Sequence, residues 1–362
     1  MSLKCGIVGL PNVGKSTLFN ALGSAKAEAA NYPFCTIEPN VGVVEVPDSR
    51  LHQLASIMKS QRVVPASTQI VDIAGIVKGA SKGEGLGNQF LHHIREVDAI
   101  VHLVRCFENE DIVHVDGSVN PERDIEVINT ELLLSDLQTL EKRIDKDQRI
   151  AKSGDKEARK NMEIFEGLRN HLNAGQPARS FPIDPSDTHR LTQLFLLTLK
   201  PVLYVANSTG KPEEKAHVEK VKAIAAKEKA QFTEIDCALE AEIAQLPESE
   251  RKEYLQGMGL EEPGLHRFIR ATFQLLGLIT YYTCGPKETR SWTISTGTKA
   301  PQAAGVIHSD FEKGFICAEC YKSDDLVKLG SEQKIKENGL YRQEGKEYTV
   351  QPGDVLLFRF NV

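Results

Sequence analysis

Residues 9–16 of this chain read Gly9-Leu10-Pro11-Asn12-Val13-Gly14-Lys15-Ser16 and match the spacing G-x-x-x-x-G-K-[ST] in full. The apolar run Lys4–Val8 precedes the motif and predicts a buried strand, and the periodic run Thr17–Leu22 follows it and predicts a helix. In this context, glycines let backbone N–H groups approach phosphate oxygens, and the helix directs its positive end at the same charge. The motif therefore predicts a nucleotide phosphate site at the end of a strand in an α/β sheet.

Several residues in and near this motif have the chemistry that a bound triphosphate needs. Lys15 is expected to reach the β and γ phosphates and to act in catalysis, and the Ser16 hydroxyl is expected to bind Mg²⁺. Asp72 follows a buried apolar run, and the carboxyl end of such a strand faces the ligand in a parallel sheet, so Asp72 is a second candidate Mg²⁺ ligand. The predicted phosphate-binding residues are Asn12, Val13, Gly14, Lys15, Ser16, Thr17 and Gly75, the last through its backbone N–H.

Two further loops are expected to respond to a γ-phosphate. Thr36 lies in Asn31–Asn40, a segment with two prolines, and its hydroxyl is a third candidate Mg²⁺ ligand; an ordinary turn residue is the alternative. Gly79–Gly87 is rich in glycine and is expected to order around the γ-phosphate and to relax after hydrolysis. This arrangement is typical of a nucleotide-dependent switch.

The wider pattern predicts an α/β fold with an insertion and a further domain. Short β-branched runs alternate with amphipathic segments, which favours a parallel sheet with helices on both faces. Between 120 and 199, leucines at helical spacing predict two long antiparallel helices. We expect an α/β domain at 1–120 and 200–277, an inserted helical arm at 121–199 and a mixed α+β domain at 278–362. The predicted strands are Lys4–Val8, Val41–Val46, Thr68–Ile73, Ala99–Cys106, Val202–Ala206, Phe232–Ile235, Ser291–Ser295, Gly314–Cys320, Glu347–Val350 and Val355–Phe360.

Composition limits the class of protein. The chain has 362 residues, a formal net charge of −6 and seven scattered cysteines, which favours a cytoplasmic globular protein with reduced thiols. No apolar run approaches the roughly 18 residues of a membrane helix, so no membrane partner is expected. The mild acidity gives no bulk support for nucleic-acid binding, but Lys142–Lys160 carries eight basic and four acidic residues. This stretch is either a solvated, salt-bridged helix face or an arm that contacts RNA phosphates.

The motifs together resemble a known family. Gly6–Thr17 resembles the P-loop GTPases of the Obg-related, translation-factor class, and the stretches Asn31–Asn40, Gly79–Gly87 and Phe311–Phe315 narrow the resemblance to the YchF / Obg-like ATPase family. The resemblance covers almost the whole chain. It implies a P-loop NTPase G domain, an inserted helical (coiled-coil) arm and a C-terminal TGS domain of β-grasp type. It also implies a cytosolic hydrolase that binds ribosomes and prefers ATP although its fold is that of a GTPase.

One departure from ordinary GTPases concerns catalysis. Many GTPases place a glutamine directly after the glycine that corresponds to Gly75, whereas Ile76 stands here and has no group that can orient a water molecule. The related family also has a hydrophobic residue at this position. His114 follows the predicted strand Ala99–Cys106 on the ligand side of the sheet, and we expect it to swing in on activation and accept a proton. The alternative is a loop histidine without a catalytic role.

A second departure concerns the base. GTPases usually carry N-K-x-D after the fifth strand and the related family N-x-x-E, whereas Gly210 stands at the acidic position after Asn207. Without that carboxylate, guanine loses a contact worth about 1–3 kcal/mol, so ATP is expected to bind at least as tightly as GTP. Glu213 and Glu214 follow at the wrong spacing to replace it. The expected base contacts are Asn207, Ser208, Cys237 and Ala238.

The sequence as a whole predicts a monomeric switch that hydrolyses ATP, with GTP as a second candidate substrate, in translation regulation or stress response. Its expected partners are ATP or GTP and the ribosome, as the large subunit or the whole particle, with RNA contacts through the arm and the TGS domain. Its expected cofactors are Mg²⁺ and, beside Asn12, K⁺. Two alternatives stay open: a GTPase chaperone of ribosome assembly or tRNA modification, and a nucleotide-gated ribosome-binding module with negligible turnover.

Overall fold

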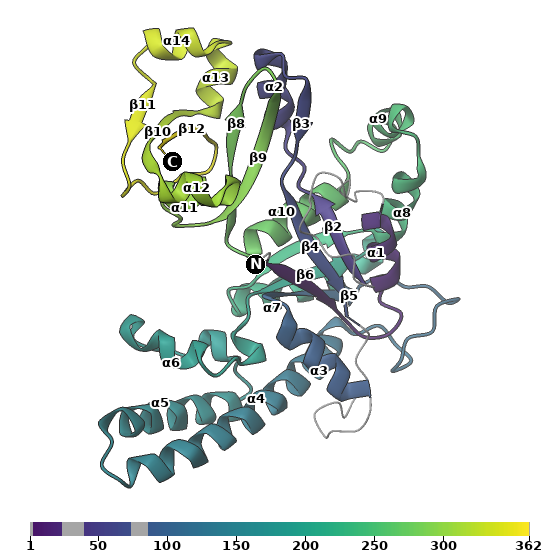
Figure 1. The fold of residues 1–362 in the computed structure, drawn as a ribbon. Helices are drawn as coiled ribbons and strands as arrows, with labels where there is room; N and C mark the ends of the chain where they lie inside the picture. The colour runs from purple at the N-terminus through teal and green to yellow at the C-terminus, as the bar shows by residue number, and fades with distance from the viewer. Residues whose placement is uncertain (1–2, 24–39, 74–85, 362) are drawn as a thin grey trace. The chain divides into compact units, whose positions relative to one another are not determined.

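The computed structural model describes residues 3–23, 40–73 and 86–361 of the chain. These residues fall into two compact units (Figure 1). Within the described ranges, the first unit comprises residues 3–23, 40–42 and 69–268, and the second comprises residues 43–68 and 269–361. None of the helices in these ranges combines the length and the apolar character that a membrane span requires.

The first unit is built on a six-stranded sheet with the order β2-β4-β1-β5-β6-β7. β1 pairs in parallel with β4 and β5, β5 pairs with β6, and β6 pairs with β7. Every residue of β5 and β6 is buried, as expected for parallel strands that are covered on both faces. The strands confirm the six predicted in this part of the chain and span β1 Lys4–Val8, β2 Val41–Glu45, β4 Ser67–Asp72, β5 Ala99–Arg105, β6 Val202–Asn207 and β7 Gln231–Ile235.

Helices cover the parallel sheet of the first unit. The helix after the phosphate motif packs against α8, and α7 packs against β6, β7 and α4. Outside residues 120–199, the helices in the described part of this unit are α1 Lys15–Leu22, α3 Leu86–Glu96, α7 Lys215–Lys227, α8 Cys237–Gln245, α9 Glu248–Gly257 and α10 Gly264–Leu275, the last of which continues into the second unit. The helix predicted directly after the phosphate motif is confirmed as α1.

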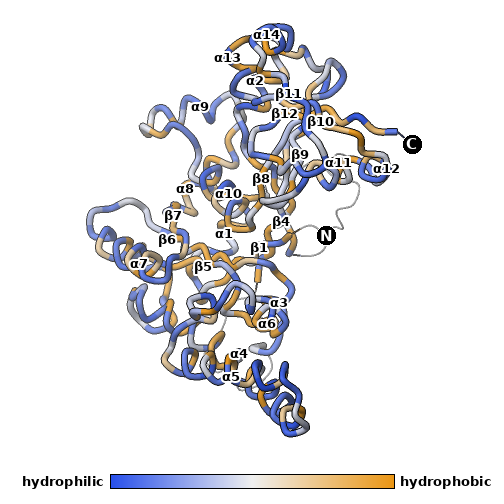
Figure 2. The backbone as a smooth tube through the Cα atoms, turned by 90° about the vertical axis from the view of Figure 1, so that its left-hand side faces the viewer, coloured by the Kyte–Doolittle hydropathy of each residue, from blue (hydrophilic) through white to orange (hydrophobic). Residues whose placement is uncertain are grey.

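The two long helices predicted between 120 and 199 are present as α4 (Pro121–Ala151) and α5 (Lys156–Asn173). The Asn120 side chain caps α4 by accepting a hydrogen bond from the Arg123 N–H. Leucines from both helices share one buried cluster with residues around 178–196. Residues 152–157, at the turn between the helices, are all exposed, and Figure 2 shows hydrophilic residues at this end of the hairpin.

The second unit has its own six-stranded sheet, with the order β11-β10-β12-β8-β9-β3. Tyr281 and Tyr282 are neighbours in β8 and both are fully buried, because successive side chains of a strand point to opposite faces. Tyr281 packs in the cluster that includes α11, and Tyr282 packs in the cluster that includes α2 and α13. The elements are α2 Ser49–Met58, β3 Arg62–Val64, β8 Leu278–Cys284, β9 Glu288–Ser295, α11 Ala300–Ile307, α12 Ser309–Lys313, β10 Phe315–Lys322, α13 Ser323–Leu329, α14 Glu332–Glu337, β11 Arg342–Glu344 and β12 Asp354–Phe360.

The described contacts divide the chain differently from the boundary expected at 278. β3 pairs in parallel with β9, and residues 43–68 therefore belong to the same unit as residues 269–361. The strand predicted at Glu347–Val350 is wrong, because this segment makes only an isolated bridge between Thr349 and Lys299. Its backbone hydrogen bonds go to residue 298 in a turn, residue 300 at a helix start and residue 345 just before it, and the edge strand beside β10 is β11 instead.

Asp136 links α4 to the segment before β6, and its removal should destabilise the first unit. The carboxylate is 1% exposed and accepts hydrogen bonds from the N–H groups of Leu197 and Thr198 at 2.7 and 2.8 Å. Asp136→Ala should lower the free energy of unfolding by about 3 kcal/mol, because it leaves buried donors without an acceptor. Urea unfolding measures this, with exposed Asp145→Ala on the same helix as the control. Equal midpoints for the two variants would contradict the assignment.

Candidate functional site

The phosphate motif forms a loop between β1 and α1 whose shape depends on two glycines. A Cβ on Gly9 would lie 2.6 Å from the backbone oxygen of Leu103. Gly14 has φ 102°, a left-handed conformation, and a Cβ there would lie 2.4 Å from Nδ2 of Asn207. At these two positions, only glycine lets the loop approach its neighbours this closely.

Lys15 and Asp72 form the charged centre of the site. The Lys15 ammonium donates to the backbone oxygens of Gly9 and Leu10 at 2.9 and 2.8 Å. Burial lowers the pKa of Lys15 to about 8, with the nearby Asp72 carboxylate opposing the shift. Burial likewise raises the pKa of Asp72, with Lys15 opposing that shift. Both groups are thus less well solvated than in water and would gain from a ligand of opposite charge.

The oxygen atoms at this site suit the coordination of a Mg²⁺ ion. Asp72 lies beside Ile7 in the sheet register, so its carboxylate is next to the start of the phosphate loop. Its buried Oδ1 has no hydrogen-bond partner among the described residues, and the Ser16 side chain at the start of α1 is exposed. A carboxylate and a hydroxyl supply the oxygen ligands that Mg²⁺ takes. The third candidate ligand, Thr36, and the candidate γ-phosphate contact, Gly75, lie outside the described residues, as do Ile76 and residues 79–85 of the glycine-rich loop.

His114 lies on the loop after β5 and is held by two hydrogen bonds. The side chain is buried, its Nε2 is 2.8 Å from Oδ2 of Asp124, and its Nδ1 accepts from the N–H of Asp116. These partners place the proton on Nε2, which donates to Asp124 in the first turn of α4. The neighbouring residue Val113 accepts a hydrogen bond from Nδ2 of Asn12 at 3.1 Å, so the His114 loop touches the phosphate loop.

The buried guanidinium of Arg105 also fixes the loop that contains His114. Arg105 ends β5 and is 2% exposed. It donates to the backbone oxygens of Phe107, Asn109 and Ile112, and its guanidinium lies over the Phe107 ring. Sequence reasoning missed this residue because its partners are carbonyl groups, which every residue carries.

Asn207 brings the predicted base contacts to the phosphate loop. Its Nδ2 donates to the Val13 oxygen at 2.9 Å, and its Oδ1 accepts from the Cys237 N–H at 3.1 Å. The ends of β6 and β7 therefore lie beside the phosphate loop. Ala238 follows in the first turn of α8, where its N–H donates to the capping carboxylate of Asp236.

Glu214 is a second residue that sequence reasoning missed, although its side chain completes the loop after β6. The carboxylate is 0% exposed. Its Oε2 accepts from Ser208 Oγ and the Thr209 N–H, and its Oε1 accepts from Thr209 Oγ1. The Ser208 hydroxyl thus donates to Glu214, so the expected base contact of Ser208 would have to come from its backbone. Spacing could not indicate this pairing, because a short 3-10 turn at Pro212–Glu214 brings the carboxylate back to the loop.

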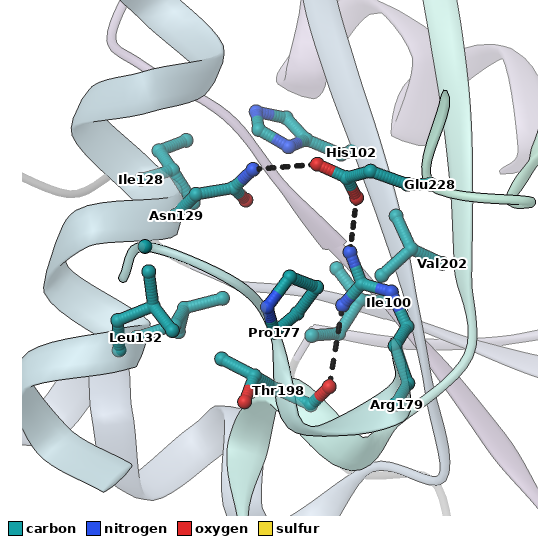
Figure 3. A pocket seen from close by; sticks show the side chains of 12 residues that line it. Ile100, His102, Ile128, Asn129, Leu132, Pro177, Arg179, Thr198, Val202 and Glu228 are labelled. Carbon is teal, nitrogen blue, oxygen red and sulfur yellow. Dashed lines mark hydrogen bonds and ion pairs between the residues drawn. The ribbon is translucent and has the colours of Figure 1, made fainter. Parts of the chain in front are cut away.

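An enclosed cavity of about 20 Å³ lies elsewhere in the first unit, between β5, β6 and α4 (Figure 3). Arg179, Glu228 and Asn129 form a hydrogen-bonded chain along its wall. Burial lowers the pKa of the adjacent His102 to about 3, so this imidazole is neutral. A space of this size holds about one water molecule, so the cavity is not a candidate for a nucleotide or substrate.

Comparisons with known proteins identify the family of this chain. The family of 50S ribosome-binding GTPases matches residues 4–151, and the YchF-GTPase C-terminal family, described as a protein of unknown function, matches residues 278–361. Proteins named ribosome-binding ATPase YchF from Escherichia coli O157:H7 and Bacillus subtilis (strain 168) are 54% and 51% identical to this chain over 100% of both chains. The solved structure of the Schizosaccharomyces pombe YchF GTPase is 37% identical, with a TM-score of 0.88 over 99% of this chain and 98% of that chain.

The pKa of Lys15 makes triphosphate binding dependent on pH. At pH 8.5 the free protein holds Lys15 largely neutral, because burial lowers its pKa to about 8, and a bound triphosphate must restore the charge. Binding of Mg·ATP should therefore take up protons at pH 8.5 and weaken as the pH rises further. Calorimetry in buffers of different ionisation enthalpy measures this uptake. Lys15→Arg keeps its charge at this pH and should show none; an absence of uptake in the unaltered protein would contradict the lowered pKa.

Proposed function

The chain belongs to the YchF family, and we propose that it binds the ribosome and hydrolyses ATP in the site around Lys15. It is a P-loop nucleoside triphosphatase. The observation that carries the proposal is the charged centre of that site, at the carboxyl end of β4, where the Lys15 ammonium and the Asp72 carboxylate lie. One buried oxygen of that carboxylate has no partner among the described residues. Around it, the phosphate loop has the glycine geometry that lets backbone N–H groups contact phosphate oxygens.

The residues of the site then have separate roles. Lys15 releases the carbonyls of its own loop and neutralises the β and γ phosphates, and the N–H groups at the start of α1 hold the same oxygens. Ser16, Asp72 and Thr36 are the residues that would hold Mg²⁺, which when bound neutralises charge on the phosphate oxygens. The Asn12 amide oxygen makes no hydrogen bond to any described residue and suits a K⁺ ion beside the phosphates. Gly75 would contact the γ-phosphate through its N–H.

His114 is the proposed residue that orients the attacking water. Its loop already touches the phosphate loop through Val113 and Asn12, so a change of side-chain conformation would bring the imidazole towards the γ-phosphate. That change breaks the hydrogen bond to Asp124, which lies at the base of the arm. Movement of α4 on the ribosome would therefore alter the position of His114.

The base and the larger surfaces complete the proposal. Asn207, Cys237 and Ala238 lie beside the phosphate loop, where a purine would extend from it, and Gly210 stands where GTPases usually carry the carboxylate that reads guanine, which favours ATP. The arm at 121–199 and residues 278–362, in which we propose a TGS domain of β-grasp type, would make the ribosomal contacts, with RNA phosphates facing the basic residues of α4 and α5. We propose a cytoplasmic monomer for this role.

Single-turnover hydrolysis with and without ribosomes tests the proposed function. Purified protein should hydrolyse ATP slowly alone and faster with ribosomes, and Lys15→Ala should lower both rates by about 100-fold or more. GTP should turn over no faster than ATP. Faster GTP turnover with binding confined to assembly intermediates would favour the chaperone alternative, and nucleotide binding without turnover would favour the gated binding module.

A histidine substitution tests the catalytic role of His114. His114→Ala should leave the ATP dissociation constant unchanged and lower ribosome-stimulated turnover by about 100-fold, because it removes a group that acts only on the attacking water. His92→Ala, on the exposed face of α3, is the control and should match the unaltered protein. Unchanged turnover in His114→Ala would refute the role.

A further inference from the structure

The loop between β6 and α7 carries a buried carboxylate that neither phosphate chemistry nor the arm uses. Glu214 is 0% exposed, although acidic side chains are almost never fully buried without partners. It ends the 3-10 turn Pro212–Glu214, and its own N–H donates to the Lys211 oxygen. Its neighbour Glu213 is exposed. The side chain of Glu214 therefore turns inward to a specific set of donors.

Glu214 accepts hydrogen bonds from most of the donors in this loop. Its Oε2 accepts from Ser208 Oγ at 3.0 Å and from the Thr209 N–H at 2.7 Å, and its Oε1 accepts from Thr209 Oγ1 at 2.8 Å. The Gly210 N–H donates to Ser208 Oγ at 3.0 Å, and the Ser208 N–H donates to the Ile235 oxygen at 3.0 Å. Every N–H and hydroxyl from 208 to 210 is thus satisfied inside the protein.

The backbone acceptors of the loop have no such partners. The backbone oxygens of Ser208 and Thr209 accept no hydrogen bond within the part of the chain that the structure describes. This loop follows Asn207, whose amide contacts the Val13 oxygen of the phosphate loop. A purine that extends from the phosphate loop towards the ends of β6 and β7 would therefore meet carbonyl oxygens rather than N–H groups.

We propose that Glu214 is a positioning residue for nucleotide choice: by holding the donors of residues 208–210, it leaves a base-facing loop of acceptors only. The 6-amino group of adenine is a donor and pairs with such a loop, whereas O6 of guanine is an acceptor and is left facing another acceptor. The enclosed carboxylate itself cannot reach the N1–H of guanine. Because ATP binding is part of the proposed function, this role rests on that proposal.

Calorimetric titration of ATP and GTP against matched variants tests the role. Glu214→Gln keeps the shape of the side chain but turns one acceptor oxygen into an amide donor, so the loop must rearrange. ATP should then bind about 10-fold more weakly, and GTP at most about 2-fold more weakly. Glu213→Gln makes the same change on the exposed neighbour and should alter neither. Binding of inorganic tripolyphosphate should be the same in all three proteins, because the phosphate loop is untouched.

A milder variant covers the case in which Glu214→Gln does not fold. Thr209→Val removes only the hydroxyl that donates to Oε1 and should lower the ratio of ATP to GTP affinity about 3-fold. An unchanged ratio in the folded variants, or equal weakening of both nucleotides, would overturn the role of Glu214 and leave it as a structural side chain. The unaltered protein is measured first: if it binds no ATP, the proposed function fails, irrespective of the variants.

Discussion

The side-chain amide of Asn207 joins the three loops from which the site is built. Its donor goes to Val13 in the phosphate loop and its acceptor receives the N–H of Cys237, so one 5% exposed group fixes the ends of β1, β6 and β7 against each other. The contact is possible only because residue 14 is glycine, since a Cβ there would overlap Nδ2. Both the donor and the acceptor of this amide are engaged, and water has little access to it. The positions of the phosphate and base contacts therefore depend on these two hydrogen bonds.

Buried charges in the first unit divide into two kinds. Glu214 and Asp136 accept several hydrogen bonds each from groups of the chain itself, and such carboxylates hold loops in place. Lys15 and Asp72 are different, because they lie beside the phosphate loop and one oxygen of Asp72 has no described partner. Satisfied charges specify the structure, whereas poorly solvated charges at a strand end identify where a ligand of matching charge belongs.

Most of the features that could be predicted, such as the phosphate loop and the parallel strands, depend on short stretches of sequence. The phosphate loop follows from residues 9–16 because every group it needs lies within one turn and one helix start, and the parallel strands follow from runs of buried β-branched residues. Pairings between distant residues could not be foreseen: His114 with Asp124 and β3 with β9 depend on how separate segments meet. Glu347–Val350 has the alternation of a strand, yet its hydrogen bonds go to a turn. Thr36 and Gly75 stay predictions because they lie outside the described residues.

Because β3 pairs with β9, an early segment of the chain belongs to the unit that is otherwise formed by its last residues. The two units can therefore not be separated by dividing the sequence at one point. Among the described residues, the chain passes from one unit to the other at residues 42/43, 68/69 and 268/269, so no single cut yields two intact halves. A fragment that ended before residue 278 would keep β3 and α2 but lose β9 and Tyr282. It would expose an unpaired strand edge and the apolar side chains of Leu51 and Leu54, which are both features that promote aggregation. The nucleotide-binding unit and the C-terminal unit therefore have to be produced together as one chain.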